Sequence, residues 1–453
     1  MGQRRWFGTD GIRGRVGKAP MTTEFVAAVG AAAGKYFSKE KPGGTVLVAR
    51  DTRGSGAELE AALAAGLESA GLKVFRLGVM PSGAVAMITP ELGACAGAIL
   101  SASHNPAEDN GLKFCRADGR KLEDAEEEQI EAFLDLEHLP TVTTKAGGVD
   151  FSCDPKALET YGNKLRGGFG PGFSLKGLKV LVDAANGAAW KTTPEILKGL
   201  GAEVQTLADR PDGKNINEGC GSEHPEQLLA AVKARPGWIG IAHDGDADRL
   251  VLVDEEGERV DGDEAIAMAA LDALERGALP GKTVVATVMS NLGLEEAMAA
   301  KGGKVKRTPV GDRYVAAAMR EGGFAVGGEA SGHLLFTDVS PAWDGLLSAL
   351  KILDLVKRKG RALSQLRKGM KKYPQKLVNL KVRHKPAWES VPPLAAAVRE
   401  MEKFLGNKGR ILLRYSGTEP KVRLLVEADE ADKFQKVQER LVPVLNEHLG
   451  VSE

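Results

Sequence analysis

Thr45-Val46-Leu47-Val48-Ala49-Arg50-Asp51 (residues 45–51) is a short apolar run that ends in charged residues. A run of this kind predicts a strand buried on both faces of a sheet. Two later runs, Lys179–Asp183 and Thr283–Thr287, repeat the pattern, and each leads into a turn. We therefore expect three related α/β units in tandem.

The rest of the chain extends this organisation outward from those strands. Further strands are predicted at 73–77 and 95–100, and helices at 55–70 and 124–136. After about Tyr373 the order changes to strand, helix, strand, strand, helix, which predicts a small α+β domain. Its elements are expected at 376–382, 391–404, 410–413, 422–426 and 432–445. The predicted domains are 1–150, 151–257, 258–372 and 373–453.

Composition excludes several classes of function. The 453 residues carry no formal net charge, so we expect no general affinity for nucleic acid or anionic membranes. No apolar stretch is long enough to cross a bilayer, and no signal sequence follows the basic start. The four cysteines are scattered without a C-x-x-C pair, which favours reduced thiols in a cytoplasmic protein.

The run Ser101-Ala102-Ser103-His104-Asn105-Pro106 directly follows the predicted strand at 95–100. It places a hydroxyl nucleophile in a turn that Pro106 makes rigid. Serine needs a base or a cation to activate it, and His104 and Lys113 are the candidates nearby. An ordinary Ser/Asn/Pro turn is the structural alternative. A hydrolase is disfavoured because there is no G-x-S-x-G pattern.

Three aspartates alternate with small residues in Asp244-Gly245-Asp246-Ala247-Asp248, between predicted strands at 238–242 and 250–253. The small residues let the carboxylates converge, and their repulsion would be relieved by a hard divalent cation such as Mg²⁺. Arg249 can pair with a carboxylate or a phosphate oxygen. It also stands where an EF-hand loop requires glycine, which argues against calcium binding. A solvated acidic turn is the remaining alternative.

Two glycine-containing loops offer groups for recognising a ligand. In 326–333, Glu329 and Ser331 can bond to neighbouring hydroxyls, as in sugar recognition, and His333 is either part of that site or a packed side chain. In 414–420, a guanidinium, hydroxyls and backbone N–H groups form a concave turn suited to a phosphate. Its residues are Arg414, Ser416, Gly417 and Thr418, with Arg423 as a second cation. Plain turns are the alternative reading of both loops.

The N-terminal run Gly8-Thr9-Asp10-Gly11-Ile12-Arg13-Gly14 could present Arg13 to a phosphate. It is not a P-loop, because no G-K-[ST] follows.

Taken in order, these loops resemble the α-D-phosphohexomutase superfamily, and the resemblance covers nearly the whole chain. It rests on Ser101–Pro106 with Asn110–Lys113, on Asp244–Arg249, on Gly328–His333 and on Arg414–Pro420. Residues 7–14, 288–293 and 310–314 resemble the bacterial branch that acts on glucosamine phosphates. One departure is Ala247, where the family usually has glycine.

The resemblance implies four domains around a central cleft and one Mg²⁺ per chain. Ser103 would carry a phosphate and, with the aspartates at 244, 246 and 248, bind the metal. Arg13 and Lys113 match catalytic positions, Glu329 and Ser331 match positions that hold sugar hydroxyls, and Arg414 to Thr418 match a phosphate clamp. His104, Arg249, His333 and Arg423 complete the expected site. A homodimer is also suggested by relatives.

The expected reaction interconverts glucosamine 6-phosphate and glucosamine 1-phosphate through a phosphoserine and a 1,6-bisphosphate, with a hexose or hexosamine 1,6-bisphosphate as activator. The same chemistry on mannose or glucose phosphates is the nearest alternative. A metal-dependent sugar phosphatase, in which water takes the phosphoryl group, and a non-catalytic sugar-phosphate sensor are alternatives of other classes.

Overall fold

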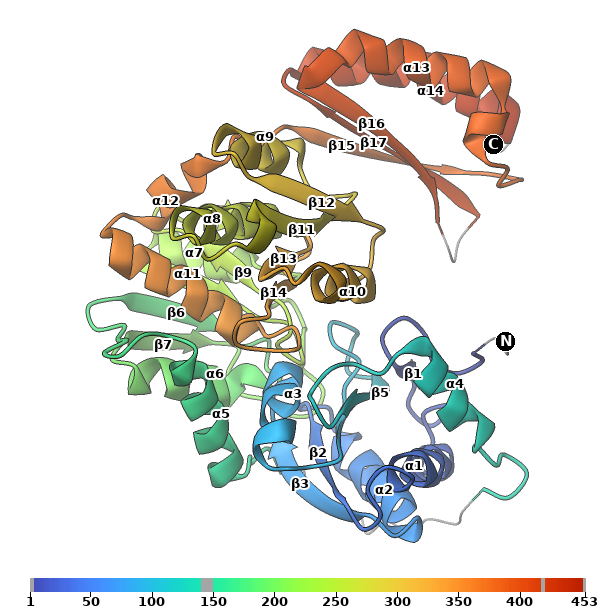
Figure 1. Ribbon diagram of the computed structural model, residues 1–453, viewed down its shortest axis with the longest axis vertical. Helices are drawn as coiled ribbons and strands as arrows, with labels where there is room; N and C mark the ends of the chain where they lie inside the picture. Colours follow the sequence, from blue (N-terminus) through green and yellow to red (C-terminus); the bar gives the residue numbers. More distant parts are fainter. Residues whose placement is uncertain (1–3, 140–149, 417–419, 451–453) are drawn as a thin grey trace.

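The computed structural model describes residues 4–139, 150–416 and 420–450, and its elements form four sheets in chain order (Figure 1). The first sheet has the strand order β1-β5-β4-β2-β3. Its strands are β1 (Ile12–Arg15), β2 (Thr45–Arg50), β3 (Lys73–Val79), β4 (Ala96–Leu100) and β5 (Asp109–Arg116). Its helices are α1 (Thr23–Ser38), α2 (Gly56–Ser69), α3 (Ser82–Glu91) and α4 (Asp124–Ala132).

The second sheet has the order β10-β9-β8-β6-β7. Its strands are β6 (Lys179–Asp183), β7 (Glu203–Leu207), β8 (Trp238–Ala242), β9 (Val251–Val253) and β10 (Arg259–Val260). Helices α5 (Pro155–Gly167), α6 (Ala189–Gly199) and α7 (Glu226–Lys233) belong to this part of the chain.

The third sheet has the order β12-β11-β13-β14. Its strands are β11 (Thr283–Thr287), β12 (Lys304–Thr308), β13 (Val326–Gly328) and β14 (Leu334–Phe336). Its helices are α8 (Gly262–Glu275), α9 (Leu292–Ala300), α10 (Asp312–Gly322), α11 (Gly345–Lys359) and α12 (Leu363–Leu366).

One topology is repeated in the three sheets. In each, a central strand pairs in parallel with the next two strands of the chain, and the second of these pairs with an antiparallel strand. β6 and β11 occupy the position of β2 in their own sheets. The tandem α/β organisation expected from the three similar strand runs is therefore confirmed.

The three units share one apolar core. A single cluster of buried side chains joins Leu77 of the first unit, Val180 and Ile241 of the second, and Ile266 and Leu350 of the third. Burying so much apolar surface between the units fixes how they are placed relative to one another. The loops at their edges are thereby held in a fixed arrangement.

The fourth unit has a core of its own. Strands β15 (Gln375–Lys381), β17 (Lys421–Ala428) and β16 (Gly409–Tyr415) form an antiparallel sheet in that order. Helices α13 (Pro392–Leu405) and α14 (Ala431–Leu449) cover one face, as Figure 1 shows at the top of the molecule. The predicted order of elements is confirmed. The unit contacts the third one near Tyr373, whose N–H donates to Asn291 Oδ1 over 2.9 Å.

One predicted helix is shorter than expected. Helix α4 ends at Ala132, although the sequence predicted helix to 136. The Asp135 carboxylate accepts the backbone N–H groups of Glu137 and His138, both over 3.1 Å. This local bonding offers the backbone an alternative to the helix and starts the following turn.

Within the described ranges, no helix combines the length and the apolar character that crossing a bilayer requires.

Candidate active site

The three loops singled out in the first three units occupy the same place in the repeated topology. Each connects the last parallel strand to the antiparallel strand: Ser101–Pro106 joins β4 to β5, Asp244–Arg249 joins β8 to β9, and Glu329–His333 joins β13 to β14. Because the units are packed on one core, these equivalent turns lie together. The site is therefore built from three copies of one structural position.

Ser103 lies at the turn of its loop with a left-handed backbone, φ +51°. A non-glycine residue costs about 1–2 kcal/mol in this conformation, so the surrounding structure must hold it. Ser101 Oγ accepts the Ser103 N–H over 2.9 Å and donates to Asp51 Oδ2 over 2.6 Å. The completely buried Arg53 donates to the Ser103 carbonyl over 2.9 Å. These bonds fix the direction in which the Ser103 hydroxyl points.

The Ser103 hydroxyl points at the aspartate loop of the second unit. Its Oγ donates to Asp244 Oδ2 over 2.6 Å, and its side chain is almost completely buried. Asn217 Nδ2 donates to the Ser103 carbonyl over 2.9 Å. A Cβ at Gly245 would lie 2.5 Å from that carbonyl oxygen, so only glycine lets the two loops approach this closely.

The three aspartates form a compact anionic cage. One carboxylate oxygen from each of Asp244, Asp246 and Asp248 lies within 4.8 Å of the others, and all three residues are buried. Burial and the two neighbouring carboxylates raise the pKa of Asp244. Asp246 Oδ1 is buried and has no hydrogen-bond partner among the described residues. Three carboxylate oxygens this close together are the oxygen ligands that a hard divalent cation prefers, and the unpaired oxygen of Asp246 is available for one, so the residues fit a metal.

Ala247 of this loop also has a left-handed backbone, φ +59°. This explains why the resemblance led us to expect glycine there. The methyl group is buried against Ala184 and Ala189, so the strain is partly offset by packing.

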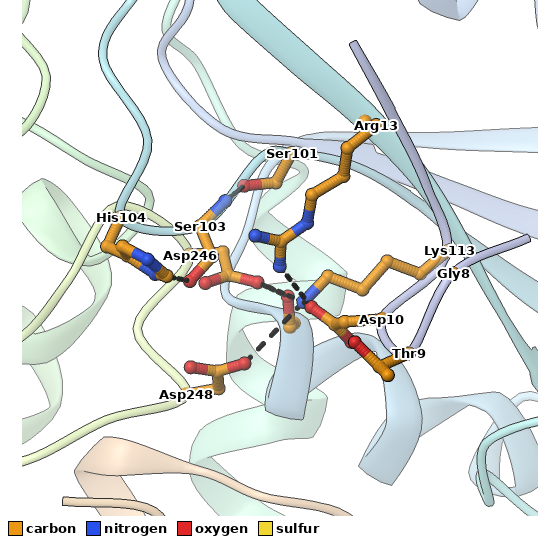
Figure 2. A network of polar contacts seen from close by, with 12 residues as sticks. Gly8, Thr9, Asp10, Arg13, Ser101, Ser103, His104, Lys113, Asp246 and Asp248 are labelled. Carbon is orange, nitrogen blue, oxygen red and sulfur yellow. Dashed lines mark hydrogen bonds and ion pairs between the residues drawn. The ribbon is translucent and has the colours of Figure 1, made fainter. Parts of the chain in front are cut away.

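Lys113 and Asp10 stand beside the cage (Figure 2). Lys113 Nζ lies 2.7 Å from Asp246 Oδ2, 3.1 Å from Asp10 Oδ2 and 3.5 Å from Asp248 Oδ2. Burial opposes the charge on Lys113, but these carboxylates raise its pKa well above the ordinary value. Arg13 also pairs with Asp10 Oδ2, the oxygen that Lys113 contacts. The first unit thus supplies two cations to the centre.

Arg249 and His104 border the serine on the other side. His104 Nδ1 accepts from Arg249 Nη2 over 3.1 Å and lies 3.4 Å from Ser103 Oγ. Burial and the Arg249 guanidinium lower the pKa of His104, which leaves its imidazole neutral at pH 7. Arg249 also pairs with Glu223 over 2.7 Å.

The loop of the third unit is bonded to the aspartate cage through His333. Its Nε2 lies 3.2 Å from Asp248 Oδ1 and its Nδ1 lies 3.3 Å from Glu329 Oε2. Burial opposes its charge, but Asp248 and Glu329 raise the pKa of His333 to about 10. Ser331 Oγ lies 3.2 Å from the same ring. His333 therefore joins two loops and is more than a packed side chain.

The arginine turn lies in the fourth unit. Arg414 of β16 is the register partner of Arg423 of β17. Burial and the adjacent Arg423 lower the pKa of Arg414, as two cations side by side would. The Ser416 carbonyl accepts from Lys385 Nζ over 2.7 Å. An anion would relieve this concentration of positive charge. Gly417 and Thr418, which the sequence also assigned to this turn, lie outside the described residues.

Several residues at the centre were missed by the sequence reading. Asp51 and Arg53 follow the β2 strand, so the rule that polar residues at strand ends share one edge could have indicated them. Asp10 lies within the N-terminal glycine run from which only Arg13 was taken. Asn217 and Glu223 carry no sequence signal, because their role depends on packing between units.

Comparisons with known proteins match this architecture. Four family models match in chain order. "Phosphoglucomutase/phosphomannomutase, alpha/beta/alpha domain I" matches residues 4–139, and the corresponding domains II and III match 172–257 and 261–373. The C-terminal domain of the same family matches 377–444. The matched ranges do not decide the domain boundaries, so the boundaries at 150, 257 and 372 stay predictions.

Relatives named phosphoglucosamine mutase match over the full length. The protein of Syntrophotalea carbinolica is 43% identical, with 99% of each chain covered. That of Cereibacter sphaeroides is 45% identical, covering 98% of this chain and 99% of the relative. A solved phosphoglucomutase/phosphomannomutase family protein of Burkholderia thailandensis has a TM-score of 0.80 at 28% identity, covering 99% of this chain and 98% of that one.

A more distant structure shares the fold. It is Aspergillus fumigatus N-acetylphosphoglucosamine mutase in complex with GlcNAc-6P and magnesium, with a TM-score of 0.64 at 19% identity, covering 99% of this chain and 96% of that one.

Proposed function

The chain belongs to the phosphoglucomutase/phosphomannomutase family, and we propose that it interconverts glucosamine 6-phosphate and glucosamine 1-phosphate. It is an isomerase that moves a phosphoryl group between two positions of one sugar. Full-length similarity to relatives named phosphoglucosamine mutase supports the choice of sugar. The observation that carries the chemistry is the 2.6 Å approach of Ser103 Oγ to Asp244 at the aspartate cage.

Phosphorylated Ser103 is the donor in the first step. The hydroxyl at C1 of glucosamine 6-phosphate attacks the phosphorus, the bond from phosphorus to Ser103 Oγ breaks, and the hydroxyl proton passes to a base. The product is the 1,6-bisphosphate, which turns over within the site. Ser103 Oγ then attacks the phosphorus of the phosphate at C6, and the bond from that phosphorus to the C6 oxygen breaks. The C6 oxygen takes up the proton held by the base, and glucosamine 1-phosphate leaves. Asp244 and His104 are the proton acceptors closest to Ser103, at 2.6 and 3.4 Å.

We assign one Mg²⁺ per chain to Asp244, Asp246 and Asp248 together with the phosphate on Ser103. The buried, unpartnered oxygen of Asp246 supports this assignment. When bound, the cation neutralises charge on the phosphoryl group being transferred. Arg13, Lys113 and Arg249 place three further cations around the same point, where they orient the phosphate. A sugar 1,6-bisphosphate serves as activator by phosphorylating Ser103.

Substrate is held from two sides. Glu329, Ser331 and His333 bond to sugar hydroxyls next to the cage. Arg414, Ser416, Gly417, Thr418 and Arg423 hold the phosphate that is not being transferred. The pair of adjacent guanidinium groups on β16 and β17 supports this role, because charge-assisted bonds to phosphate are strong.

Phosphoglucose or phosphomannose is the second candidate substrate, since the family description names both sugars. Initial rates with the glucosamine, glucose and mannose 6-phosphates, measured side by side with catalytic glucose 1,6-bisphosphate and Mg²⁺, distinguish them. We expect glucosamine 6-phosphate to give the highest kcat/KM. Release of inorganic phosphate faster than formation of the isomer would indicate a phosphatase instead.

We further propose a cytoplasmic homodimer. The four cysteines are free and buried, which supports a reducing compartment. Light scattering on the purified protein tests the dimer, and fractionation of cells that express it tests the location.

A further inference from the structure

Lys113 contacts the carboxylates that a bound metal would use, so we expect it to move when a metal binds. Its ammonium contacts Asp246 and Asp248 and therefore partly neutralises the cage (Figure 2). A divalent cation bound by the same carboxylates would repel the ammonium at short range. The lysine would then have to leave both aspartates while remaining buried. A buried ammonium without a partner is strongly disfavoured, so another carboxylate must hold it.

Asp10 is placed to do this. Among the described residues, three carboxylates contact Lys113, and Asp10 is the one outside the cage. The two residues are neighbours by construction, because β1, which follows Asp10, pairs with β5, which carries Lys113. A Cβ at Gly11 would lie 2.4 Å from the Leu112 carbonyl oxygen, so the Asp10 loop packs directly against that strand.

Asp10 is itself fixed from the opposite side. Lys121 Nζ bridges Asp10 Oδ1 over 2.8 Å and Asp312 Oδ2 over 3.1 Å. Asp312 begins helix α10 of the third unit, and the adjacent Arg313 donates to the Thr9 carbonyl over 2.7 Å. The first and third units therefore both help to hold the Asp10 loop beside the cage. Asp312 and Arg313 of the run at 310–314 thereby have a structural role that the reaction does not require.

We propose that Asp10 is a positioning residue that retains the Lys113 ammonium when a divalent cation enters the aspartate cage, so that lysine and metal do not compete for Asp246. The inference rests on the proposed metal site and names a role for a residue outside it.

The test measures metal binding directly. Mn²⁺, whose free form is seen by electron paramagnetic resonance, is titrated into the protein and into Asp10→Asn. With Asp10 neutral, Lys113 stays among the aspartates, and we expect Mn²⁺ to bind roughly tenfold more weakly. Asp10→Glu keeps the charge and should bind within about threefold of the unsubstituted protein. Asp338→Asn removes an exposed partner of Lys351 and serves as the matched control.

A double-mutant cycle separates this role from simple attraction between Asp10 and the metal. In a Lys113→Met background no ammonium competes, so Asp10→Asn should change Mn²⁺ affinity less than about twofold. The same roughly tenfold loss in both backgrounds would overturn the inference, since Asp10 would then act through its field alone. Unchanged affinity in Asp10→Asn would also overturn it. Absence of Mn²⁺ binding by the unsubstituted protein would overturn the metal site as well.

Discussion

The serine–aspartate centre and the arginine turn of the fourth unit are built in opposite ways. The centre is assembled from equivalent turns of three units on one core, and its side chains are buried and bonded across units. The arginine turn belongs to a unit with a separate core. That unit joins the third at a few polar contacts, including Arg410 to the Ser290 carbonyl over 2.6 Å.

The difference follows from what each region must do. Phosphoryl transfer needs fixed distances, which a shared core provides. A bisphosphate that turns over must be held while its two phosphates exchange places, and a unit with a core of its own lacks the packing that fixes the other three units to one another. Substitutions at the centre should therefore remove chemistry, and substitutions at the arginine turn should weaken binding.

Ser103→Ala, at the serine–aspartate centre, should have the largest effect on turnover. Without an oxygen to carry the phosphoryl group, turnover should fall by at least about a thousandfold. The loss of one hydrogen bond to Asp244 should leave the circular dichroism spectrum unchanged. Mutase activity within tenfold of the unsubstituted enzyme would mean that the phosphoryl group is carried elsewhere.

Removal of divalent cations should have the next largest effect. A chelator is expected to lower kcat by at least about a hundredfold, because the clustered aspartates would then repel the phosphate. Mg²⁺ added back should restore the rate, which a coupled assay for glucosamine 1-phosphate measures. Full activity in the chelator would contradict the role of the cage.

Arg414→Ala tests the arginine turn of the fourth unit. Loss of a charge-assisted bond to phosphate should raise KM about tenfold to a hundredfold and change kcat less than about threefold. Arg399→Ala, an exposed arginine on α13, is the matched control and should change neither. A fall in kcat with KM unchanged would show that the turn takes part in the chemical step, and the comparison would fail.

The pH dependence of stability should differ between the two regions. Burial raises the pKa of Asp344, which accepts from Tyr161 at the junction of the packed units, to about 7. The folded state then binds more protons than the unfolded state between about pH 4 and pH 7, so stability falls as pH rises through this window. Asp344→Asn, which still caps α11, should flatten that slope in urea unfolding.

Asp429 of the fourth unit gives the contrasting case. A hydrogen bond from Lys433 lowers the pKa of Asp429 below its ordinary value, so its contribution to stability is lost only as the pH falls below about 4. Asp429→Asn should leave the slope between pH 4 and 7 unchanged. An equal change of slope in both variants would contradict the assignment to Asp344.

Ala247→Gly should have the smallest effect. Relief of left-handed strain is worth about 1 kcal/mol, and loss of one buried methyl group costs about the same. The free energy of unfolding should therefore change by less than about 1 kcal/mol. Destabilisation above about 3 kcal/mol in urea titrations would show that the methyl packing dominates.

The sequence predicted the parts of this site that depend on local pattern. Ser103 and the aspartates at 244, 246 and 248 stand out because each run follows a buried strand and contains residue types that suit one chemistry. The repeated strand runs also predicted the tandem units.

What the sequence could not supply depends on how the units meet. The pairing of Lys113 with Asp246 joins residues 133 positions apart, and Lys121 meets Asp312 over 191. Arg53 looks like an ordinary charged residue after a strand, yet it is completely buried and holds the serine loop. The early end of α4 was missed because one side chain, Asp135, competed with the helix.

The central claim is that Ser103 carries the phosphoryl group beside the aspartate cage. The protein is incubated with glucose 1,6-bisphosphate and Mg²⁺, digested, and its phosphopeptides are located by mass spectrometry. The account predicts phosphate on Ser103, and a labelled phosphoryl group placed there should pass to the sugar phosphate when unlabelled glucosamine 6-phosphate is added. Phosphate on Ser101 or on another residue, with Ser103 unmodified, would contradict it.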